Sequence, residues 1–231
     1  EAVLAADPEA VVHLAAVGPQ YYAPSRVYEN NTLAAYHVLT AAGEAGADVV
    51  WTSSESVYGW VFAEGQVLPD ALPVSVDHAC RPEDQYGVSK VAAEATAEAV
   101  ARRYDVPVTT IRPSWIQHPG AYECTDAGGE DVVDNFWSYV DVRDVVRLIQ
   151  AALESPPDGE ETVQAAAAEN YVGRPTRELF EESFGSVPTP CDLTGTESAL
   201  STANAAATYD WEPEYSYHEA ATDDLGPWDD W

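Results

Sequence analysis

Short apolar segments alternate with helical segments along the first two thirds of this chain, and this alternation constrains the fold more than any other feature. Apolar runs of four to six residues predict buried strands, and alanine-rich segments with apolar spacing of three and four predict helices. A strand–helix–strand unit almost always forms a right-handed crossover between parallel strands, so the pattern predicts an α/β fold with a parallel sheet. Strands are expected at residues 11–16, 48–53 and 106–112, and helices at 29–45, 84–104 and 142–154.

The last third of the chain has a different character, beginning at Pro156-Pro157. A strand is expected at residues 162–168, and helices at 176–184 and 198–209. These elements predict a small mixed lobe that follows the larger α/β part. The expected organisation is therefore a main domain, a substrate-binding lobe and an acidic tail, at residues 1–155, 156–222 and 223–231.

The charge of the chain is extreme, with 40 acidic and 10 basic residues and a net charge of −30. Such a chain repels phosphate backbones and anionic lipids, so neither nucleic acid nor a membrane is an expected partner. The acids are spread along the whole sequence, and lysine occurs once. A dispersed acidic surface with little lysine is typical of proteins from salt-loving archaea, where a Debye length of about 3 Å at molar salt screens the repulsion.

Cys80, Cys124 and Cys191 are far apart, and no Cys-x-x-Cys pair occurs. They are interpreted as reduced thiols of a cytoplasmic protein, which also has no apolar run long enough for a membrane span. The five histidines show no metal-ligand spacing, so no metal site is expected. The sequence contains no methionine, and residues 1–9 resemble the end of a helix. We therefore expect that the natural N-terminus is missing.

The single lysine, Lys90, follows Tyr86 by four residues within the helix expected at 84–104. Residues four apart share a helix face, so the phenol and the ammonium can meet. A nearby cation is expected to lower the tyrosine pKa, which would suit a general base near neutral pH. The alternative is a chance pair on a solvated helix face.

Several motifs around this pair follow one another in a specific order. The order resembles that of the extended short-chain dehydrogenases, also called the NAD-dependent epimerase/dehydratase family, over roughly residues 9–155. The resemblance implies a Rossmann-like doubly wound parallel sheet and a bound NAD or NADP. The motifs are His13-Leu14-Ala15-Ala16, Asn31 opening a helix, Ser53-Ser54-Glu55-Ser56-Val57-Tyr58-Gly59, Tyr86-Gly87-Val88-Ser89-Lys90 and Ile111-Arg112-Pro113.

The resemblance also implies roles for individual residues. Ser54, Tyr86 and Lys90 occupy the positions of the family's catalytic residues. The lysine would hold the nicotinamide ribose, and the serine would bind the reacting oxygen. The positions that the resemblance places beside the cofactor are Leu14, Ala15, Ala16, Asn31, Tyr86, Lys90, Pro113 and Ser114, and those placed near the substrate are Glu55, Ser56 and Trp115.

One departure from the family is large. The family begins with a Gly-x-x-Gly-x-x-Gly turn, whose amides and helix N-terminus hold the pyrophosphate. No such motif occurs here, and Gly128-Gly129 does not follow a strand. The dinucleotide-binding domain is therefore expected to be incomplete at its N-terminus.

The substrate is interpreted as a small sugar, of aldose or sugar-acid type. The segment between Pro113 and Trp137 has no Lys or Arg to meet a diphosphate or a carboxylate, which favours a neutral sugar, and residues 136–141 resemble those of uronate dehydrogenases. The alternatives are a nucleotide-sugar epimerase or dehydratase and a non-catalytic dinucleotide-binding regulatory protein. Within the family, helices at the positions of 29–45 and 84–104 commonly pair, so a homodimer is expected.

Overall fold

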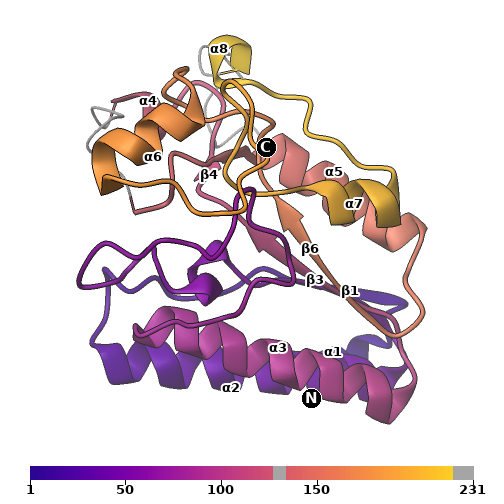
Figure 1. Ribbon diagram of the computed structural model, residues 1–231. Coiled ribbons are helices and arrows are strands. Elements are labelled where there is room, and N and C mark those ends of the chain that lie inside the picture. Colours follow the sequence, from indigo (N-terminus) through magenta and orange to yellow (C-terminus); the bar gives the residue numbers. More distant parts are fainter. Residues whose placement is uncertain (127–133, 221–231) are drawn as a thin grey trace.

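Four parallel strands form one sheet between two layers of helices in the computed structural model, which describes residues 1–126 and 134–220 (Figure 1). The strands lie in the order β1-β2-β3-β6, and each neighbouring pair is parallel. This arrangement confirms the predicted α/β fold. The bounds of the strands are Ala10–His13 for β1, Asp48–Thr52 for β2, Val108–Pro113 for β3 and Glu160–Ala165 for β6.

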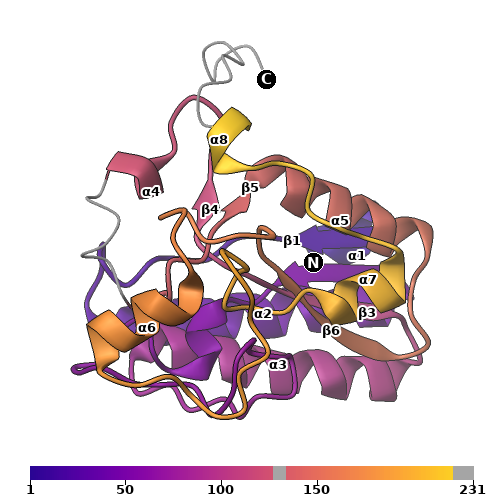
Figure 2. The same ribbon diagram turned by 45° about the horizontal axis from the view of Figure 1, so that its top comes forward.

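The long helices cover both faces of this sheet. Helices α2 (Pro24–Ala45) and α3 (Gln85–Tyr104) lie side by side on one face, and α5 (Val142–Glu154) and α7 (Ala203–Tyr209) lie on the other (Figures 1 and 2). The shorter elements are α1 (Ala2–Ala6), η1 (Glu55–Tyr58), β4 (Ile116–Gln117), α4 (Glu123–Asp126), β5 (Val140–Asp141), α6 (Thr176–Phe184) and α8 (Tyr217–Ala220).

The period of two along β2 divides the core between the two faces of the sheet. Val49 and Trp51 pack with α2 and α3, whereas Val50 packs with α5 and the segment around Tyr209. All three β2 side chains are buried, and burial of a large apolar side chain stabilises the fold by about 1.5–3 kcal/mol. The strand is therefore fixed in register from both sides, which fixes the loop at its carboxyl end.

A third core, made mostly of aromatic rings, lies beyond the carboxyl ends of the strands. Trp60 stacks on Tyr58 with centroids 4.8 Å apart, and Phe136 contacts Trp60 at 4.8 Å and Phe180 at 5.1 Å. These residues come from η1, the loop before β5 and α6. The cluster therefore packs three distant segments together on the side of the sheet where a ligand site is expected.

The structure corrects the sequence analysis at β1 and β6. The segment at residues 11–16 was expected to be a buried strand, but β1 pairs only with β2 among the described strands and is largely exposed at Val12. The strand expected in the small lobe is β6, which pairs with β3 along its whole length. This strand therefore belongs to the main sheet, and the division into domains stays a prediction.

Two local predictions were also wrong. Helix α2 begins at Pro24 instead of residue 29, because proline suits the first turn of a helix, so Asn31 lies within α2 and does not open it. Residues 137–141 were expected to be extended, but Trp137 has a positive φ of 56° and is buried in the aromatic core, as is Phe136, whose φ is 53°. The predicted tail at 223–231 lies outside the described residues.

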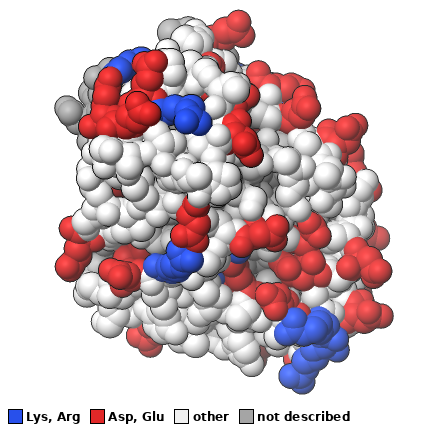
Figure 3. Space-filling model, viewed as in Figure 1, with Lys and Arg blue, Asp and Glu red and all other residues white. Residues whose placement is uncertain are grey.

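Acidic side chains are spread over the face shown in Figure 3, and basic side chains gather at only a few places on it. No helix of residues 1–126 and 134–220 is both long and apolar enough to cross a membrane. In the same part of the chain no three His, Cys, Asp or Glu side chains form a group that could hold a metal ion.

Candidate active site

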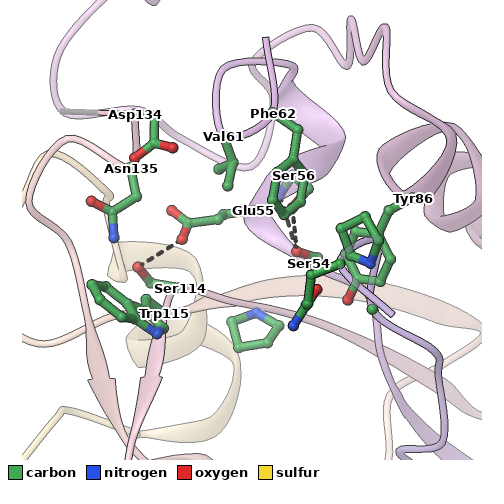
Figure 4. A pocket seen from close by; sticks show the side chains of 14 residues that line it. Ser54, Glu55, Ser56, Val61, Phe62, Tyr86, Ser114, Trp115, Asp134 and Asn135 are labelled. Atoms are coloured by element: carbon green, nitrogen blue, oxygen red, sulfur yellow. Dashed lines mark hydrogen bonds between the residues drawn. The ribbon is translucent and has the colours of Figure 1, made fainter. Parts of the chain in front are cut away.

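A pocket of about 380 Å³ opens at the carboxyl ends of β2 and β3. Ligands of open parallel sheets bind outside this edge, because the loops that follow neighbouring strands meet there. Figure 4 shows Ser54 and Tyr86 on one side of the pocket and Ser114 and Trp115 on the other. The lining residues are Gly18, Pro19, Gln20, Ser54, Glu55, Ser56, Val61, Phe62, Tyr86, Pro113, Ser114, Trp115, Asp134 and Asn135.

Ser54 is held by the short helix that follows β2. Its side-chain oxygen accepts a hydrogen bond from the Ser56 backbone N–H at 3.1 Å, and its hydroxyl donates to the Ser56 hydroxyl at 2.9 Å. Such N-terminal capping is a common use of serine. The helix ends at Gly59, where φ is 98° and an added Cβ would lie 2.2 Å from the Arg81 carbonyl oxygen. The geometry of this turn therefore depends on serine at one end and glycine at the other.

Tyr86 is placed by the first turn of α3. The Asp84 carboxylate caps the helix and accepts hydrogen bonds from the backbone N–H groups of Tyr86 and Gly87, both at 2.8 Å. A Cβ on Gly87 would lie 2.6 Å from the Ser56 carbonyl oxygen, so glycine permits the close approach of α3 to η1. This contact brings Tyr86 and Ser54 to the same pocket.

The protonation state of Tyr86 differs from the expectation. Burial raises the pKa of the Tyr86 phenol; a hydrogen bond with Ser54 opposes this shift, and the Asp84 charge adds to it. The ammonium of Lys90 lies 5.6 Å from the centroid of the Tyr86 ring and is no cause of the shift. The prediction that Lys90 lowers the pKa of Tyr86 was therefore wrong, and Tyr86 is a neutral phenol near neutral pH.

Lys90 lies behind the pocket and does not line it. Its ammonium donates to the Thr52 carbonyl at the end of β2, at 2.7 Å, and the residue is 5% exposed. Burial lowers the pKa of Lys90 to about 8, although the Glu94 charge opposes the shift. An ammonium carries three N–H donors, and Lys90 uses one of them on the protein among the described residues.

Asn31 acts through the loop that follows β1. Its amide accepts from the Val17 N–H at 2.8 Å, donates to the Val17 carbonyl at 3.1 Å, and reaches the Ser89 hydroxyl at 3.4 Å. Asn31 therefore ties this loop to α3 and does not line the pocket. Leu14, Ala15 and Ala16 do not line it either, but they form an exposed surface beside it, with Leu14 54% exposed.

Glu55 is the most deeply buried acid of the pocket wall. Its Oε1 accepts from the Ser114 hydroxyl at 3.2 Å, whereas its buried Oε2 has no hydrogen-bond partner among the described residues. Burial raises the pKa of Glu55 well above 4.5; the Ser114 hydrogen bond opposes this, the Asp134 charge adds to it, and the Trp115 backbone opposes it. Burial therefore favours the protonated form of Glu55.

Two loops of the pocket were missed by the sequence analysis. Residues 18–20 follow β1, and Asp134 and Asn135 precede the turn at 136–137. For the second loop, the one available sequence signal was the Asp134-Asn135 pair, because Asp and Asn are typical of turns. Phe62, whose ring meets that of Tyr86 edge-on at 6.0 Å, lies in a long loop without a sequence signal of its own.

Comparison with known proteins decides the family. The model of the NAD dependent epimerase/dehydratase family matches residues 1–128. The chain belongs to this family. The cofactor prediction, NAD or NADP, is thereby confirmed at the level of the family, whose description is NAD-dependent.

Two curated relatives and one solved structure illustrate the range of this family. An L-arabinose 1-dehydrogenase (NAD(P)(+)) of Haloferax volcanii is 36% identical over 112 residues, which are 46% of this chain and 44% of that protein. A UDP-glucose 4-epimerase of Rhizobium meliloti is 34% identical over 87 residues, 36% of this chain and 24% of that protein. The matches thus span less than half of each curated relative.

The solved structure is a short-chain dehydrogenase/reductase superfamily protein from Agrobacterium tumefaciens with bound NAD. The structural match covers 95% of this chain and 80% of the Agrobacterium tumefaciens chain, with a TM-score of 0.69 and 20% sequence identity. At this identity the likeness shows the fold alone. The two curated relatives are a sugar dehydrogenase and a nucleotide-sugar epimerase, and they do not identify a substrate for this chain.

Proposed function

We propose that this chain carries the reacting side chains of an NAD(P)-dependent dehydrogenase that acts on a small, uncharged sugar. One observation carries the proposal: the hydroxyls of Ser54 and Tyr86 share a pocket of about 380 Å³ whose lining residues, among those described, include no Lys or Arg. The volume suits a free sugar, and the lining offers acids and hydroxyls for its hydroxyl groups. A similarly sized pocket for an anion is expected to hold at least one basic side chain.

The chemistry follows from the two hydroxyls. During sugar oxidation the deprotonated form of Tyr86 removes the proton of the reacting hydroxyl, and the Ser54 hydroxyl donates a hydrogen bond to the same oxygen. The nicotinamide, when bound, supplies the hydride acceptor. Because burial raises the pKa of Tyr86, the oxidation rate should rise with pH across the alkaline range. In the reductive direction the neutral phenol already holds the proton that the carbonyl oxygen needs.

The residues of this chain fit the nicotinamide end of the cofactor. Lys90 has N–H donors to spare for ribose hydroxyls, and Leu14, Ala15 and Ala16 form an exposed surface of mostly small apolar residues beside it. Pro113 and Ser114 line the pocket from β3. We propose that these residues flank the nicotinamide and its ribose, with Asn31 supporting the loop after β1. No Gly-x-x-Gly-x-x-Gly motif occurs in the sequence.

The decisive test is net production of reduced nicotinamide. Full-length protein should be assayed by absorbance with NAD and with NADP, over a panel of aldoses, uronates and nucleotide sugars, in dilute buffer and in molar salt. We expect reduction of the cofactor with a neutral aldose, and more activity at high salt because the net charge of −30 is then screened. Oxidation of uronates alone would refute the assignment of an uncharged substrate.

The second candidate is a nucleotide-sugar epimerase, which is supported by the similarity to the Rhizobium meliloti enzyme. An epimerase converts its sugar without accumulating reduced cofactor, so conversion of a nucleotide sugar with no absorbance change would favour it. The regulatory alternative predicts cofactor binding with no conversion of any sugar.

A homodimer also remains a proposal: α2 exposes Tyr28, Leu33 and Tyr36, a face that a second copy can cover.

A further inference from the structure

A buried network of polar side chains lies directly behind the pocket. The Arg112 guanidinium on β3 donates from Nε and Nη2 to the two carboxylate oxygens of Glu94 on α3, both at 2.9 Å. Its Nη1 donates to the Tyr58 hydroxyl at 3.1 Å and to the Val76 carbonyl at 2.9 Å. The two charged side chains are only 8% and 12% exposed. Arg112 therefore joins β3 to α3, to η1 and to the loop that precedes α3.

Glu94 also holds the end of β2. The Ser53 hydroxyl donates to Glu94 Oε1 at 2.7 Å, and Ser53 directly precedes Ser54. The residue before Ser53 is Thr52, whose carbonyl accepts from the Lys90 ammonium. Glu94 follows Lys90 by four residues, so both side chains leave the same face of α3. Thr52, the last residue of β2, and Ser53, which follows it, are thus bound to two side chains one helical turn apart.

Glu94 also affects the charge state of Lys90. Burial favours the neutral amine, and Glu94 is the one charged group that favours the ammonium. Arg112 also depends on the Glu94 charge. Burial alone would lower the pKa of Arg112, but the Glu94 carboxylate raises it. The groups that face Lys90 are His13 on β1, the Trp51 ring and the Thr52 carbonyl on β2, and Tyr86 and Glu94 on α3.

We propose that Glu94, held by Arg112, is a positioning residue: it fixes Ser54 opposite Tyr86 and holds the Lys90 ammonium in place beside them. It acts through Ser53 and Lys90, and it lies outside the residues that line the pocket. Its effect on turnover rests on the proposed function. Its effect on Lys90 does not, because that effect exists in the protein without substrate or cofactor.

The experiment uses the fact that Lys90 is the single lysine of the chain. Protein labelled with 13C-lysine gives one side-chain ε-methylene NMR signal, whose pH titration reports Lys90 alone. The test variant is Glu94→Gln/Arg112→Met, which removes both charges, since loss of a whole buried pair is better tolerated than loss of one partner. The matched control is Glu98→Gln/Arg102→Met, an exposed ion pair one turn further along α3.

The Lys90 titration midpoint should fall below about 8 in the test variant, because the Glu94 charge raises the pKa of Lys90 and Arg112 is not among the causes of its shift. Turnover should fall on the order of tenfold to a hundredfold, with little change in KM for the sugar, as expected for a small misplacement of reacting groups. The control variant should match the wild type in both measurements. Ser53→Ala, which removes one hydrogen bond and keeps the ion pair, should lower kcat without moving the titration.

An unchanged Lys90 titration in the folded test variant overturns the proposal, and so does a normal kcat in a variant whose titration has shifted. A lower melting temperature with wild-type titration and kcat would show that the pair is merely structural. If the double variant does not fold, Glu94→Gln alone carries the same titration test. If the wild-type protein turns over no sugar but the Lys90 titration shifts as expected, the proposed function fails and the placement of Lys90 by Glu94 stands.

Discussion

Two glutamates close to Ser54 occupy opposite environments. Glu94 lies behind the pocket, where Arg112 binds both of its carboxylate oxygens. Glu55 lies in the pocket wall, where a hydroxyl binds one oxygen and no cation is present among the described lining residues. A buried carboxylate needs a cation or several donors to stay ionised, and otherwise it retains its proton. The two sites therefore give the same side chain different partners: a guanidinium at Glu94 and a single hydroxyl at Glu55.

The difference shows where this protein places its positive charge. Lys90 and Arg112, both buried, lie behind the reacting hydroxyls and not among the residues that would meet substrate. The pocket wall keeps the carboxyls of Glu55 and Asp134, and burial raises the pKa of both. The described lining of the pocket therefore holds no basic side chain, which suits the uncharged sugar proposed as substrate.

The largest effect is expected at Tyr86, the residue that faces the pocket and lies on the same helix as Lys90. Tyr86→Phe removes the hydroxyl that exchanges a proton with substrate, so kcat should fall by about 10²–10⁴-fold. The ring still packs edge-on against Phe62, so circular dichroism and the melting temperature should stay close to wild type. Tyr104→Phe is the matched control, because its hydroxyl on the same helix reaches only Glu44, at 3.5 Å. Near-normal turnover in Tyr86→Phe would refute the assigned role.

The second effect distinguishes the buried Arg112–Glu94 ion pair behind the pocket from an ion pair on the surface. Arg112→Met leaves the buried Glu94 without its cation and should lower the free energy of unfolding by about 3–5 kcal/mol. Arg102→Met breaks an exposed pair with Glu98 and should cost less than about 1 kcal/mol. Urea denaturation measures both. Equal losses in the two variants would show that the buried pair has no special weight.

The sequence predicted the parts of this arrangement that depend on local pattern. The parallel strands follow from apolar runs, and α5 and α6 begin and end as expected because their apolar periodicity is strong. Ser54 and Tyr86 do reach one pocket, and their motifs explain how: Gly87 permits the contact that joins them. Their catalytic roles stay predictions.

The remainder depends on neighbours that no local pattern contains. The exposure of β1 is set by its place in the sheet, and the pKa of Tyr86 is raised by burial, which the spacing of Tyr86 and Lys90 does not reveal. Lys90 could not be assigned to the Thr52 carbonyl from spacing alone, because that contact is 38 residues distant in sequence. The Arg112–Glu94 pair likewise joins a strand to a helix through the fold.

The third effect concerns the contact between α3 and η1. Gly87→Ala places a methyl group 2.6 Å from the Ser56 carbonyl oxygen and from Pro82 Cβ, so the helix must move away from η1. Overpacking of this kind costs about 1–3 kcal/mol, and here it should also lower kcat because Tyr86 moves with the helix. Val88→Ala, at the next and exposed position, is the control and should change neither quantity much. A fully active Gly87→Ala variant would contradict the need for close approach.

The last prediction concerns Glu55 in the pocket wall and its effect on the free energy of unfolding. Because burial raises the pKa of Glu55 well above 4.5, the folded protein keeps a proton that the unfolded chain releases as the pH passes 4.5. The folded state then binds more protons than the unfolded state, so the free energy of unfolding falls as the pH rises from 4.5 towards the folded pKa. Each unit by which the pKa is raised corresponds to about 1.4 kcal/mol.

Glu55→Gln keeps the size of the side chain and cannot ionise, so it removes this penalty. The variant should be more stable than the wild type at neutral pH, and the difference should disappear as the pH falls to 4.5, measured by urea denaturation across that range. Glu94→Gln should have the opposite sign at neutral pH, because it leaves Arg112 without its carboxylate. If both substitutions destabilise the protein equally, Glu55 is ionised in the fold, and the contrast between the two glutamates is wrong. If Glu→Gln stabilises the protein at Glu55 and destabilises it at Glu94, the presence or absence of a nearby cation explains the difference between the two carboxyls.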